Sequence, residues 1–377
     1  MNTKPISSVV VWAAAALLWA PALQADWSFV MMGDTKGEGG HTTTGVSEEL
    51  PIIAQKIASL TLKPDLVLVA GDLCCGDELA PGSPLWNYSI QFLNWKLAMQ
   101  PVFDYATNTG IPIYPVRGNH DNAQSQDAPI PDLKEAYYTA FSPYVPDNGP
   151  NTVSSGNQVG FSYSFTHNNA TFVAADQYFY YNQTPGMNGY HDLDRAWVTQ
   201  QFQESSSPYK ILMAHEPFFM TVGYKDEEHF FGDNAAGFST RSNFWNALGA
   251  NGVELYVTGH IHNESVASTT NDYGDTIIQL MAGGGGASLV PVIDKHDPGV
   301  DVLHTNDLFG FALATVSDAA MTIQYYSLHT NDNSWTVASY VTTISPNQMV
   351  PEPSAAVLLG PAVVALMTGR SRRRRRH

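Results

Sequence analysis

Polar residues that can bind metal ions follow short apolar runs at several places in this 377-residue chain. Each run has about six residues, a length typical of a buried strand, and stops at a carboxylate, an amide or an imidazole. Ligands of open α/β sheets bind outside the carboxyl ends of the strands, so these side chains are expected to lie together. In chain order they are Asp34, Asp72, Asn119, His215, His260 and His262.

Imidazoles mixed with carboxylates and one amide suit borderline divalent or trivalent ions such as Fe, Zn or Mn. A ligand set of this size serves two ions rather than one. Taken singly, each residue has a structural explanation, as a capping Asp, a solvated turn or a surface His. Their repeated position at strand ends in one chain favours a metal site.

The apolar runs predict five strands, at 27–32, 65–70, 111–116, 209–214 and 253–258. Apolar residues at helical spacing predict helices near 50–60, 133–141, 193–204 and 241–249, and alternation predicts a hairpin at 161–165 and 171–175. From 276 to 342 the pattern is all β. Residues 122–157 are expected to be a long loop that forms a wall or lid beside the site. No composition break divides the chain, so one catalytic domain is expected over 26–342.

The charge of the chain limits its partners. Lys and Arg number 18 against 35 Asp and Glu, and six of the arginines lie in the last eight residues. Because phosphate backbones need Lys and Arg to neutralise them, this balance argues against nucleic acid as a partner. An anionic substrate then needs local positive charge, which metal ions supply. The two adjacent cysteines, Cys74 and Cys75, exclude a disulfide framework and leave a strained vicinal bridge or two free thiols.

The ordered set of motifs resembles the calcineurin-like metallophosphoesterase superfamily. The motifs are Gly33-Asp34, Gly71-Asp72, Gly118-Asn119-His120-Asp121, Ala214-His215 and Gly259-His260-Ile261-His262. The step His215-Glu216-Pro217 is similar to the purple acid phosphatase branch, and the match covers about Phe29 to Gly286. The resemblance implies an α/β fold, a four-layer α/β/β/α sandwich, with the site at the carboxyl ends of the strands.

The resemblance also implies how the ligands are shared between two metal ions. Asp72 bridges the ions, and Asp34 and His262 complete the first site. The second site is completed by Asn119, His215 and His260.

The implied catalytic residue is His120, which contacts the phosphate and protonates the leaving oxygen. Two ions a few Å apart acidify a bound water to hydroxide and favour in-line attack at phosphorus. The first hypothesis is therefore a secreted binuclear phosphoesterase that hydrolyses phosphomonoesters. The alternatives are a surface-displayed protein that binds metal or phosphate without turnover, and a phosphodiesterase with the same chemistry.

Two positions depart from the family pattern. Many relatives have His two residues after the first Asp, where this chain has Lys36, and a protonated ammonium group cannot ligate a metal ion. Three residues after Asp72, where purple acid phosphatases have Tyr and protein phosphatases have Asp, this chain has Cys75. His41 or the Cys75 thiolate could complete the first ligand set, although both are expected to be bystanders. The glycines at 37, 39 and 40 favour a loop that carries Lys36 outward, which leaves three protein ligands and water for the first ion.

Both ends of the chain have the features of sorting signals. At the N-terminus, Lys4, an apolar run over 9–20 and the small residue Ala25 predict a signal peptide over residues 1–25. Residues 343–377 contain Pro351-Glu352-Pro353, an apolar segment over 355–369 and an arginine cluster. This arrangement resembles the PEP-CTERM sorting signal of exported bacterial proteins.

The apolar C-terminal segment would form a helix of roughly 22 Å, shorter than a hydrocarbon core of about 30 Å. It is expected to contact the inner membrane transiently, with the arginines on the cytoplasmic side. The resemblance implies a sorting and processing protease as a partner. It also implies delivery to the periplasm, the cell surface or the extracellular matrix of a Gram-negative bacterium. A plain tail anchor is the alternative.

Overall fold

The computed structural model describes residues 26–38, 42–76, 83, 85–122, 133–152, 156–179, 192–222, 237–293, 296–338 and 342–346. The predicted signal peptide, the apolar C-terminal segment and His41 lie outside these ranges. Among the described helices, none is both long enough and apolar enough to span a bilayer.

Two seven-stranded sheets form the centre of the protein. The first has the order β17-β16-β15-β1-β2-β5, with β18 paired to β16. Its strands are β1 (Trp27–Met32), β2 (Leu66–Ala70), β5 (Ile113–Val116), β15 (Phe309–Val316), β16 (Met321–His329), β17 (Ser334–Val337) and β18 (Thr342–Ile344).

The second sheet has the order β14-β12-β13-β11-β10-β9-β8. Its strands are β8 (Tyr163–His167), β9 (Ala170–Ala174), β10 (Tyr209–Met213), β11 (Leu255–Thr258), β12 (Glu264–Thr270), β13 (Thr276–Ala282) and β14 (Val300–Asn306). Two small pairs lie outside the large sheets, β3 (Phe103–Asp104) with β4 (Thr109–Gly110) and β6 (Asn151–Thr152) with β7 (Gly156–Asn157).

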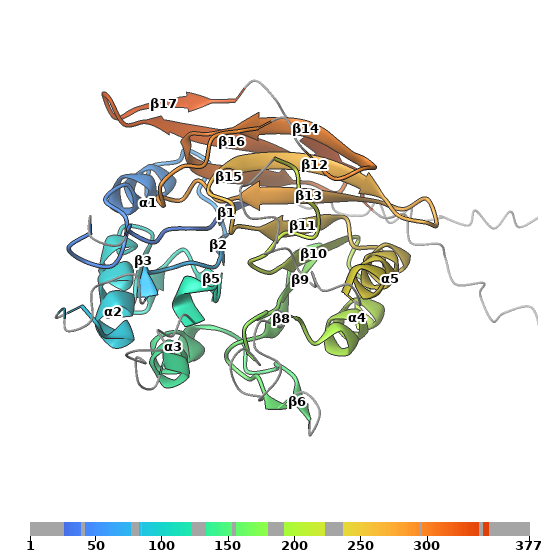
Figure 1. The fold of residues 1–377 in the computed structure, drawn as a ribbon, viewed down its shortest axis with the longest axis horizontal. Coiled ribbons are helices and arrows are strands. Elements are labelled where there is room, and N and C mark those ends of the chain that lie inside the picture. The colour runs from blue at the N-terminus through green and yellow to red at the C-terminus, as the bar shows by residue number, and fades with distance from the viewer. Residues whose placement is uncertain are drawn as a thin grey trace, which may run out of the picture.

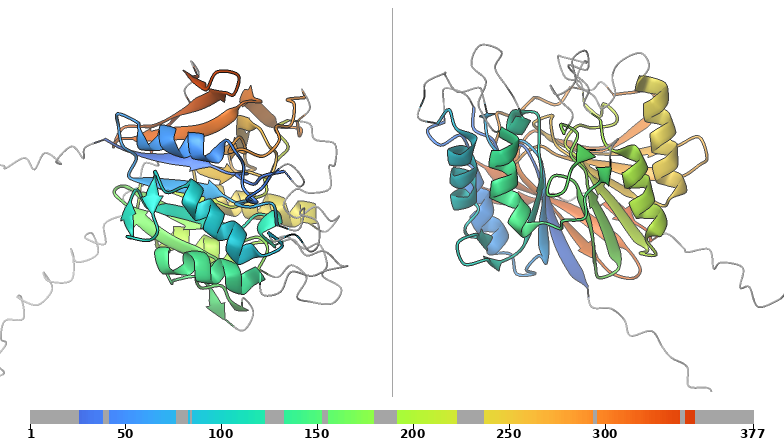
Figure 2. Two further views of the ribbon diagram at one scale, coloured as in Figure 1. Left: turned by 90° about the vertical axis from the view of Figure 1, so that its left-hand side faces the viewer. Right: turned by 90° about the horizontal axis from the view of Figure 1, so that it is seen from below.

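Helices cover the outer face of each sheet and give the molecule four layers (Figures 1 and 2). On the first sheet lie α1 (Leu50–Ala58), α2 (Tyr88–Ala98) and α3 (Leu133–Phe141), and on the second lie α4 (Arg195–Glu204) and α5 (Gly237–Ala250). Between the sheets the rings of Phe29 and Phe172 meet edge to face, with centroids 5.3 Å apart. Three apolar layers therefore separate the four layers of secondary structure, as the predicted sandwich requires.

Parallel pairing brings the ends of the central strands to one edge. In the first sheet β1, β2 and β5 run parallel, and in the second β9, β10, β11 and β13 run parallel. Strands β1, β2 and β9 are buried at every residue. Both faces of these strands are covered, so their sequences are continuous apolar runs rather than alternating ones.

Most of the predicted elements are present. The helix predicted at 133–141 has those bounds, the β8–β9 hairpin forms, and the chain after residue 276 is all β among its described residues. Helix α2 was not predicted, because Ile90, Leu93 and Leu97 are 40%, 55% and 59% exposed and obscure its apolar periodicity. In the segment predicted as a wall or lid, α3 packs on α2 in the helix layer and also contacts the short 3-10 helix η2 (His120–Asn122). Residues 123–132 of that segment lie outside the described residues.

Candidate metal centre

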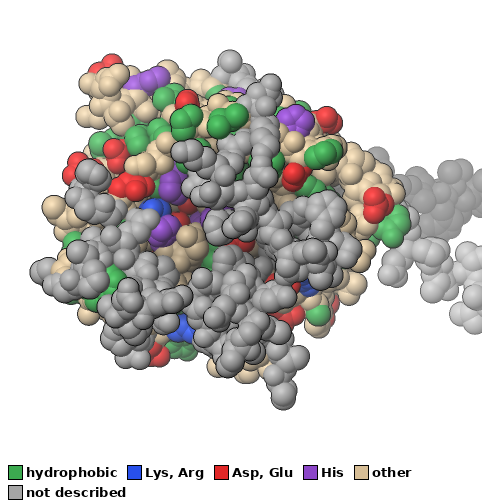
Figure 3. Space-filling model, viewed as in Figure 1, with side chains coloured by type: hydrophobic (Ala, Val, Ile, Leu, Met, Phe, Trp, Pro, Cys, Tyr) green, Lys and Arg blue, Asp and Glu red, His purple; other side chains and the backbone are tan. Residues whose placement is uncertain are grey.

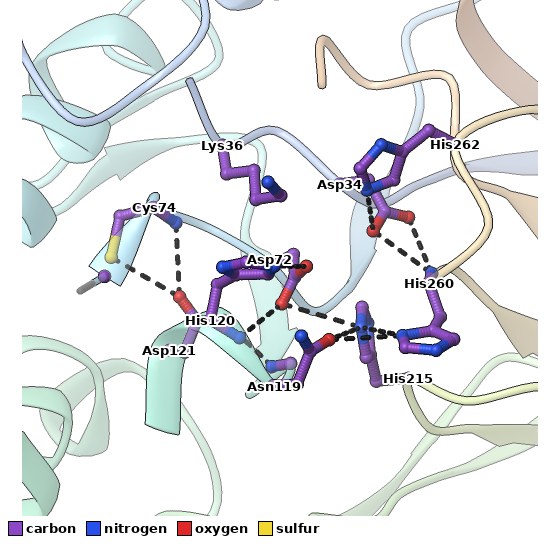
Figure 4. Close-up of polar contacts among 12 residues, drawn as sticks. Asp34, Lys36, Asp72, Cys74, Asn119, His120, Asp121, His215, His260 and His262 are labelled. Atoms are coloured by element: carbon purple, nitrogen blue, oxygen red, sulfur yellow. Dashed lines mark hydrogen bonds and ion pairs between the residues drawn. The ribbon is translucent and has the colours of Figure 1, made fainter. Parts of the chain in front are cut away.

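The predicted ligands lie together at the carboxyl ends of the parallel strands (Figure 4). Three follow β1, β2 and β5 of the first sheet, and three follow β10 and β11 of the second: Asp34, Asp72 and Asn119, then His215, His260 and His262. Figure 3 shows histidine, acidic and basic side chains gathered near the middle of the face seen in Figure 1.

The backbone is strained at three of these residues. Asp34, Asp72 and His260 have φ angles of 55°, 53° and 75°, in the left-handed region that residues other than glycine rarely adopt. Such conformations cost about 1–3 kcal/mol each and cluster at functional sites. Hydrogen bonds between the loops hold the turns, since the Asp34 N–H donates to the Gly71 carbonyl and the Gly259 N–H donates to the His215 carbonyl, each at 2.9 Å.

Two glycines allow the loops to approach the carboxylates closely. A Cβ at Gly118 would lie 2.0 Å from Asp72 Oδ1, and one at Gly259 would lie 2.4 Å from Asp34 Oδ2. Cβ contacts shorter than 3.0 Å are essentially never seen. A side chain at either position would therefore displace a carboxylate of the cluster.

The three residues predicted for the second ion converge on one point. Asn119 Oδ1 lies 3.0 Å from His215 Nε2 and 3.1 Å from His260 Nδ1, and the two nitrogens are 3.3 Å apart. His215 Nδ1 lies 2.7 Å from the Ala70 carbonyl, which can only accept, so this nitrogen carries the proton of the neutral ring. His215 Nε2 then presents a lone pair to the lone pairs of the Asn119 oxygen. A cation placed among these atoms satisfies all of them.

The residues predicted for the first ion are close but less convergent. His262 Nε2 is 3.7 Å from Asp34 Oδ1, and His262 Nδ1 donates to the Ser288 carbonyl at 2.9 Å. Asp34, Asp72 and His215 are all buried, and each offers an atom within 4.8 Å of the others. Burial, and then the nearby Asp72 carboxylate, raises the pKa of Asp34 well above its usual range. The buried carboxylates therefore need a cation to remain charged together.

These donors fit a metal centre. Carboxylate, amide and neutral imidazole groups are the ligands that Fe, Zn and Mn accept, and hydrogen bonds from outside the cluster orient both His215 and His262. The convergent set of Asn119, His215 and His260, with Asp72 beside it, could hold one ion. Asp34 and His262, also beside Asp72, could hold another.

His120 lies at the edge of the cluster. Its backbone N–H donates to Asp72 Oδ1 at 2.9 Å, and its ring Nε2 is 3.8 Å from Asp72 Oδ2. Burial lowers the pKa of His120 to about 4, although the Asp72 carboxylate acts in the opposite direction. Its side chain is 19% exposed. The ring is therefore neutral near pH 7 and accessible to a ligand beside Asp72.

Asp121 joins two of the ligand loops, a role that was not predicted. Its carboxylate accepts hydrogen bonds from the backbone N–H groups of Leu73 at 3.0 Å, Cys74 at 3.2 Å and Gly118 at 2.9 Å. Burial, and then the Asp72 carboxylate, raises the pKa of Asp121 to about 7. The loops after β2 and β5 are thereby held as one unit. The sequence signal was its place beside Asn119 and His120 in the same loop.

A buried ion pair ties the same loop to the second sheet. Arg117 donates through Nε at 2.8 Å and Nη2 at 2.6 Å to Asp176 Oδ2, and through Nη1 to Asn122 Oδ1 at 2.9 Å. Removing one partner of such a buried pair typically costs 3–5 kcal/mol. The pair was not predicted because its two residues are 59 positions apart in the chain.

The prediction for Lys36 was wrong. Its side chain points into the cluster and is 1% exposed (Figure 4). Lys36 pairs with Val46 in an antiparallel bridge, and the Ser47 N–H donates to the Thr35 carbonyl at 3.1 Å. Thr35 Oγ1 accepts a hydrogen bond from Trp95 Nε1 on α2, so the Thr35 side chain faces the helix layer. Successive side chains of an extended segment point to opposite sides, so Lys36 faces the cluster. The N–H of the next residue, Gly37, donates to the Gly45 carbonyl at 3.3 Å, so the pairing continues past Lys36.

The two cysteines are buried free thiols, so the vicinal bridge is not formed. Cys74 Sγ donates to Asp121 Oδ1, and Cys75 Sγ donates to Gln91 Oε1 of α2, both at 3.5 Å. Cys75 therefore contacts the helix layer on the outer side of the sheet.

The layered fold is that of a metallophosphoesterase. The sequence pattern of the calcineurin-like phosphoesterase family matches residues 29–264. This match covers more than half of the chain, which therefore belongs to the calcineurin-like phosphoesterase family. None of the curated proteins matches the sequence.

Several solved structures share the fold at low sequence identity. The purple acid phosphatase PPD1 from yellow lupin (Lupinus luteus) seeds aligns with a TM-score of 0.60 and 18% identity, over 85% of this chain and 54% of that one. PhoD aligns with a TM-score of 0.55 and 14% identity, over 87% of this chain and 73% of that one. GAP50 of Plasmodium is described as the anchor in the inner membrane complex. It aligns with a TM-score of 0.54 and 14% identity, over 86% of this chain and 90% of that one. This chain thus spans about half the length of the lupin phosphatase.

Proposed function

We propose that this protein is an exported, metal-dependent phosphoesterase that hydrolyses phosphomonoesters. The observation that carries the proposal is the convergence of Asn119 Oδ1, His215 Nε2 and His260 Nδ1 within 3.0–3.3 Å of one another. The family match supports metal-dependent phosphoester hydrolysis as the reaction class.

Metal ions in such a site polarise the phosphoryl group and lower the pKa of water, so that a nucleophile is available near neutral pH. Asp72, which lies beside both ligand sets described above, would help to hold them. Asp34, Asp72 and His215 are buried, so charge interactions beside them are screened less than in water.

His120 is placed to contact the substrate from the open side of the cluster. Its ring is neutral before substrate binds, and a phosphate anion beside it favours protonation by direct charge attraction. The protonated ring then donates to a phosphoryl oxygen or to the leaving oxygen. This geometry supports His120 as the general acid, as the family resemblance implies.

The charge of the site favours a monoester over a diester. A phosphomonoester is a dianion near neutral pH, and the buried Lys36 adds a positive charge beside the ligand sets. A diester carries one negative charge and gains less from this arrangement. A phosphodiesterase remains the alternative with the same chemistry.

A protein that binds metal or phosphate without turnover is the second candidate function. GAP50, which is described as an anchor, has a similar fold, so the fold alone does not imply turnover. The inward Lys36 is the specific feature of this chain that favours the second candidate, because it occupies a position at which many relatives bind metal.

The test is hydrolysis by purified protein loaded with Mn²⁺ or Zn²⁺. Phosphomonoesterase activity predicts turnover of p-nitrophenyl phosphate, little turnover of bis(p-nitrophenyl) phosphate, and loss of both in His215→Ala. His329→Ala is the matched control, since this histidine on β16 contacts Thr336 and lies outside the cluster. Metal-loaded protein that hydrolyses neither ester would favour the binding protein, and faster diester turnover would favour the diesterase.

Export is proposed from the two ends of the chain. The signal peptide over 1–25 would direct secretion, and a protease would process the sorting segment within 343–377 after transient contact with the inner membrane. The mature protein would then reside in the periplasm, at the cell surface or in the extracellular matrix. Mass spectrometry of protein from the native cell would show a mature chain that begins at Asp26 and lacks the arginine cluster. An intact N-terminus would contradict the proposal.

A further inference from the structure

The Lys36 side chain is directed toward the side of the cluster where the first metal ion is expected (Figure 4). The side chain runs from the end of β1 toward the space between Asp72, Asp34 and His262 (Figure 4). It is 1% exposed, and its nitrogen lies 3.7 Å from Glu38 Oε1. An ammonium group has three N–H donors and no acceptor, so it cannot ligate a metal ion but can donate to phosphate oxygens.

The structure holds this ammonium in place through a chain of contacts. Glu38 Oε1, which faces Lys36, accepts from the Ser288 N–H at 3.0 Å. The Ser288 carbonyl in turn accepts from His262 Nδ1 at 2.9 Å. One connected set of groups therefore fixes Lys36 beside His262, and the Lys36–Val46 backbone bridge fixes the base of the side chain.

The Lys36 side chain lies on the same side of the cluster as Asp34 and His262 (Figure 4). His262 Nε2 is 3.7 Å from Asp34 Oδ1, so a metal ion held by these two residues would lie near the ammonium group. Like charges at this range repel strongly in a partly buried site.

We infer that Lys36 replaces the first ion as the cation that binds the substrate phosphate, so that one metal ion is held tightly and the other position only weakly. The tight site is formed by Asp72, Asn119, His215 and His260. The inference rests on the proposed function and names a substrate-binding residue within it. It applies to phosphomonoester dianions, to which an ammonium group donates on one side and the ion binds on the other.

The balance of charge supports a single tight ion. Asp34, Asp72 and Glu38 bring three negative charges, and Lys36 brings one positive charge. One divalent ion therefore makes this group of charges neutral before substrate binds. A second divalent ion would make it positive and would face the fixed ammonium group directly.

The first experiment measures metal stoichiometry by calorimetric titration of chelated protein with Mn²⁺, independently of turnover. Wild-type protein should bind one ion tightly per chain, and Lys36→His should bind two. Lys36→Met, which removes the charge and keeps the length, should bind the second ion at least tenfold more tightly than wild type. Lys63→Met is the matched control, because Lys63 is exposed in the loop before β2. Two equally tight ions in wild type would overturn the inference.

The second experiment measures binding of inorganic phosphate to protein loaded with one equivalent of Mn²⁺. Lys36→Met should weaken this binding at least tenfold, whereas Lys36→Arg, which keeps the charge, and Lys63→Met should retain it. Unchanged phosphate affinity in Lys36→Met would contradict the role of Lys36 in binding.

The failures of the two proposals are distinguishable. Wild-type protein that hydrolyses p-nitrophenyl phosphate with two equally tight ions would overturn the inference about Lys36 and support the proposed function. Protein with one tight ion and Lys36-dependent phosphate binding, but no turnover of any ester, would support the inference about phosphate binding and overturn the proposed function.

Discussion

Replacement of Gly118 by alanine is predicted to disable the site while the fold is retained. The new Cβ would lie 2.0 Å from Asp72 Oδ1 and 2.4 Å from the Asp72 backbone nitrogen. Because Cβ contacts below 3.0 Å are essentially never seen, the Asp72 carboxylate must move by about 1 Å. Asp72 lies beside both predicted ligand sets, so its displacement would disturb both at once.

The size of the effect follows from this displacement. Overpacking of one methyl group in a well-packed region costs about 1–3 kcal/mol, which most folded domains of this size tolerate. A misplacement of about 1 Å in a reacting constellation costs about 100-fold in rate. We therefore expect kcat/KM for p-nitrophenyl phosphate to fall about 100-fold, whereas the cooperative unfolding transition remains.

Gly274→Ala provides the matched control. Gly274 has φ +91°, and a Cβ there would meet nothing within 4 Å. The control therefore carries a backbone cost of about 1–2 kcal/mol without any contact to the cluster. Its kcat/KM should equal that of wild type. Wild-type activity in Gly118→Ala, with unfolding unchanged, would refute the placement of Asp72 at the centre of the site.

Three further predictions concern the residues beside Asp72. Asn119→Ala should lose most of the activity and still fold, because it removes one of the three convergent ligands; wild-type turnover would rule out that role. His120→Ala should retain a larger fraction of the wild-type rate on p-nitrophenyl phosphate than on an alkyl phosphate, because a good leaving group needs less protonation. Equal losses on both esters would rule out the general-acid role and leave phosphate binding as the only role of His120. In metal-free protein, burial lowers the pKa of His120 from 6.5 to about 4, so the unfolded chain takes up the proton first as the pH falls. The stability that the neutral ring contributes is therefore lost as the pH falls from 6.5 to 4. Over that range the unfolding free energy of wild type should fall, relative to that of His120→Gln, by about 3 kcal/mol. A difference that stays constant with pH would show that the ring is not buried in its neutral form.

The strand-end positions of the ligands could be predicted from the sequence because the signal is local. A fully buried parallel strand is a short apolar run, and the polar residue that follows the end of the strand lies at the edge of the sheet. Local periodicity likewise placed α3 and the β8–β9 hairpin, through helical spacing and through alternation. The layered fold was implied by the family resemblance that the order of the motifs carries.

Features that depend on distant pairing could not be predicted in this way. The direction of Lys36 depends on the pairing of residues 35–37 with 45–47 and on the contact between Thr35 and Trp95. The glycines near Lys36 suggested flexibility, but backbone pairing holds residues 35–37. Asp121 and Arg117 were missed for a related reason, because their partners lie on loops after other strands.

Asn119, His215 and His260, with Asp72, are expected to form a metal site. Anomalous diffraction at the Mn absorption edge, from crystals of the protein grown with Mn²⁺, would locate the ion. We expect a strong anomalous peak among Asn119 Oδ1, His215 Nε2, His260 Nδ1 and the Asp72 carboxylate. Crystals grown with excess Mn²⁺ that show no peak at this position would contradict this expectation.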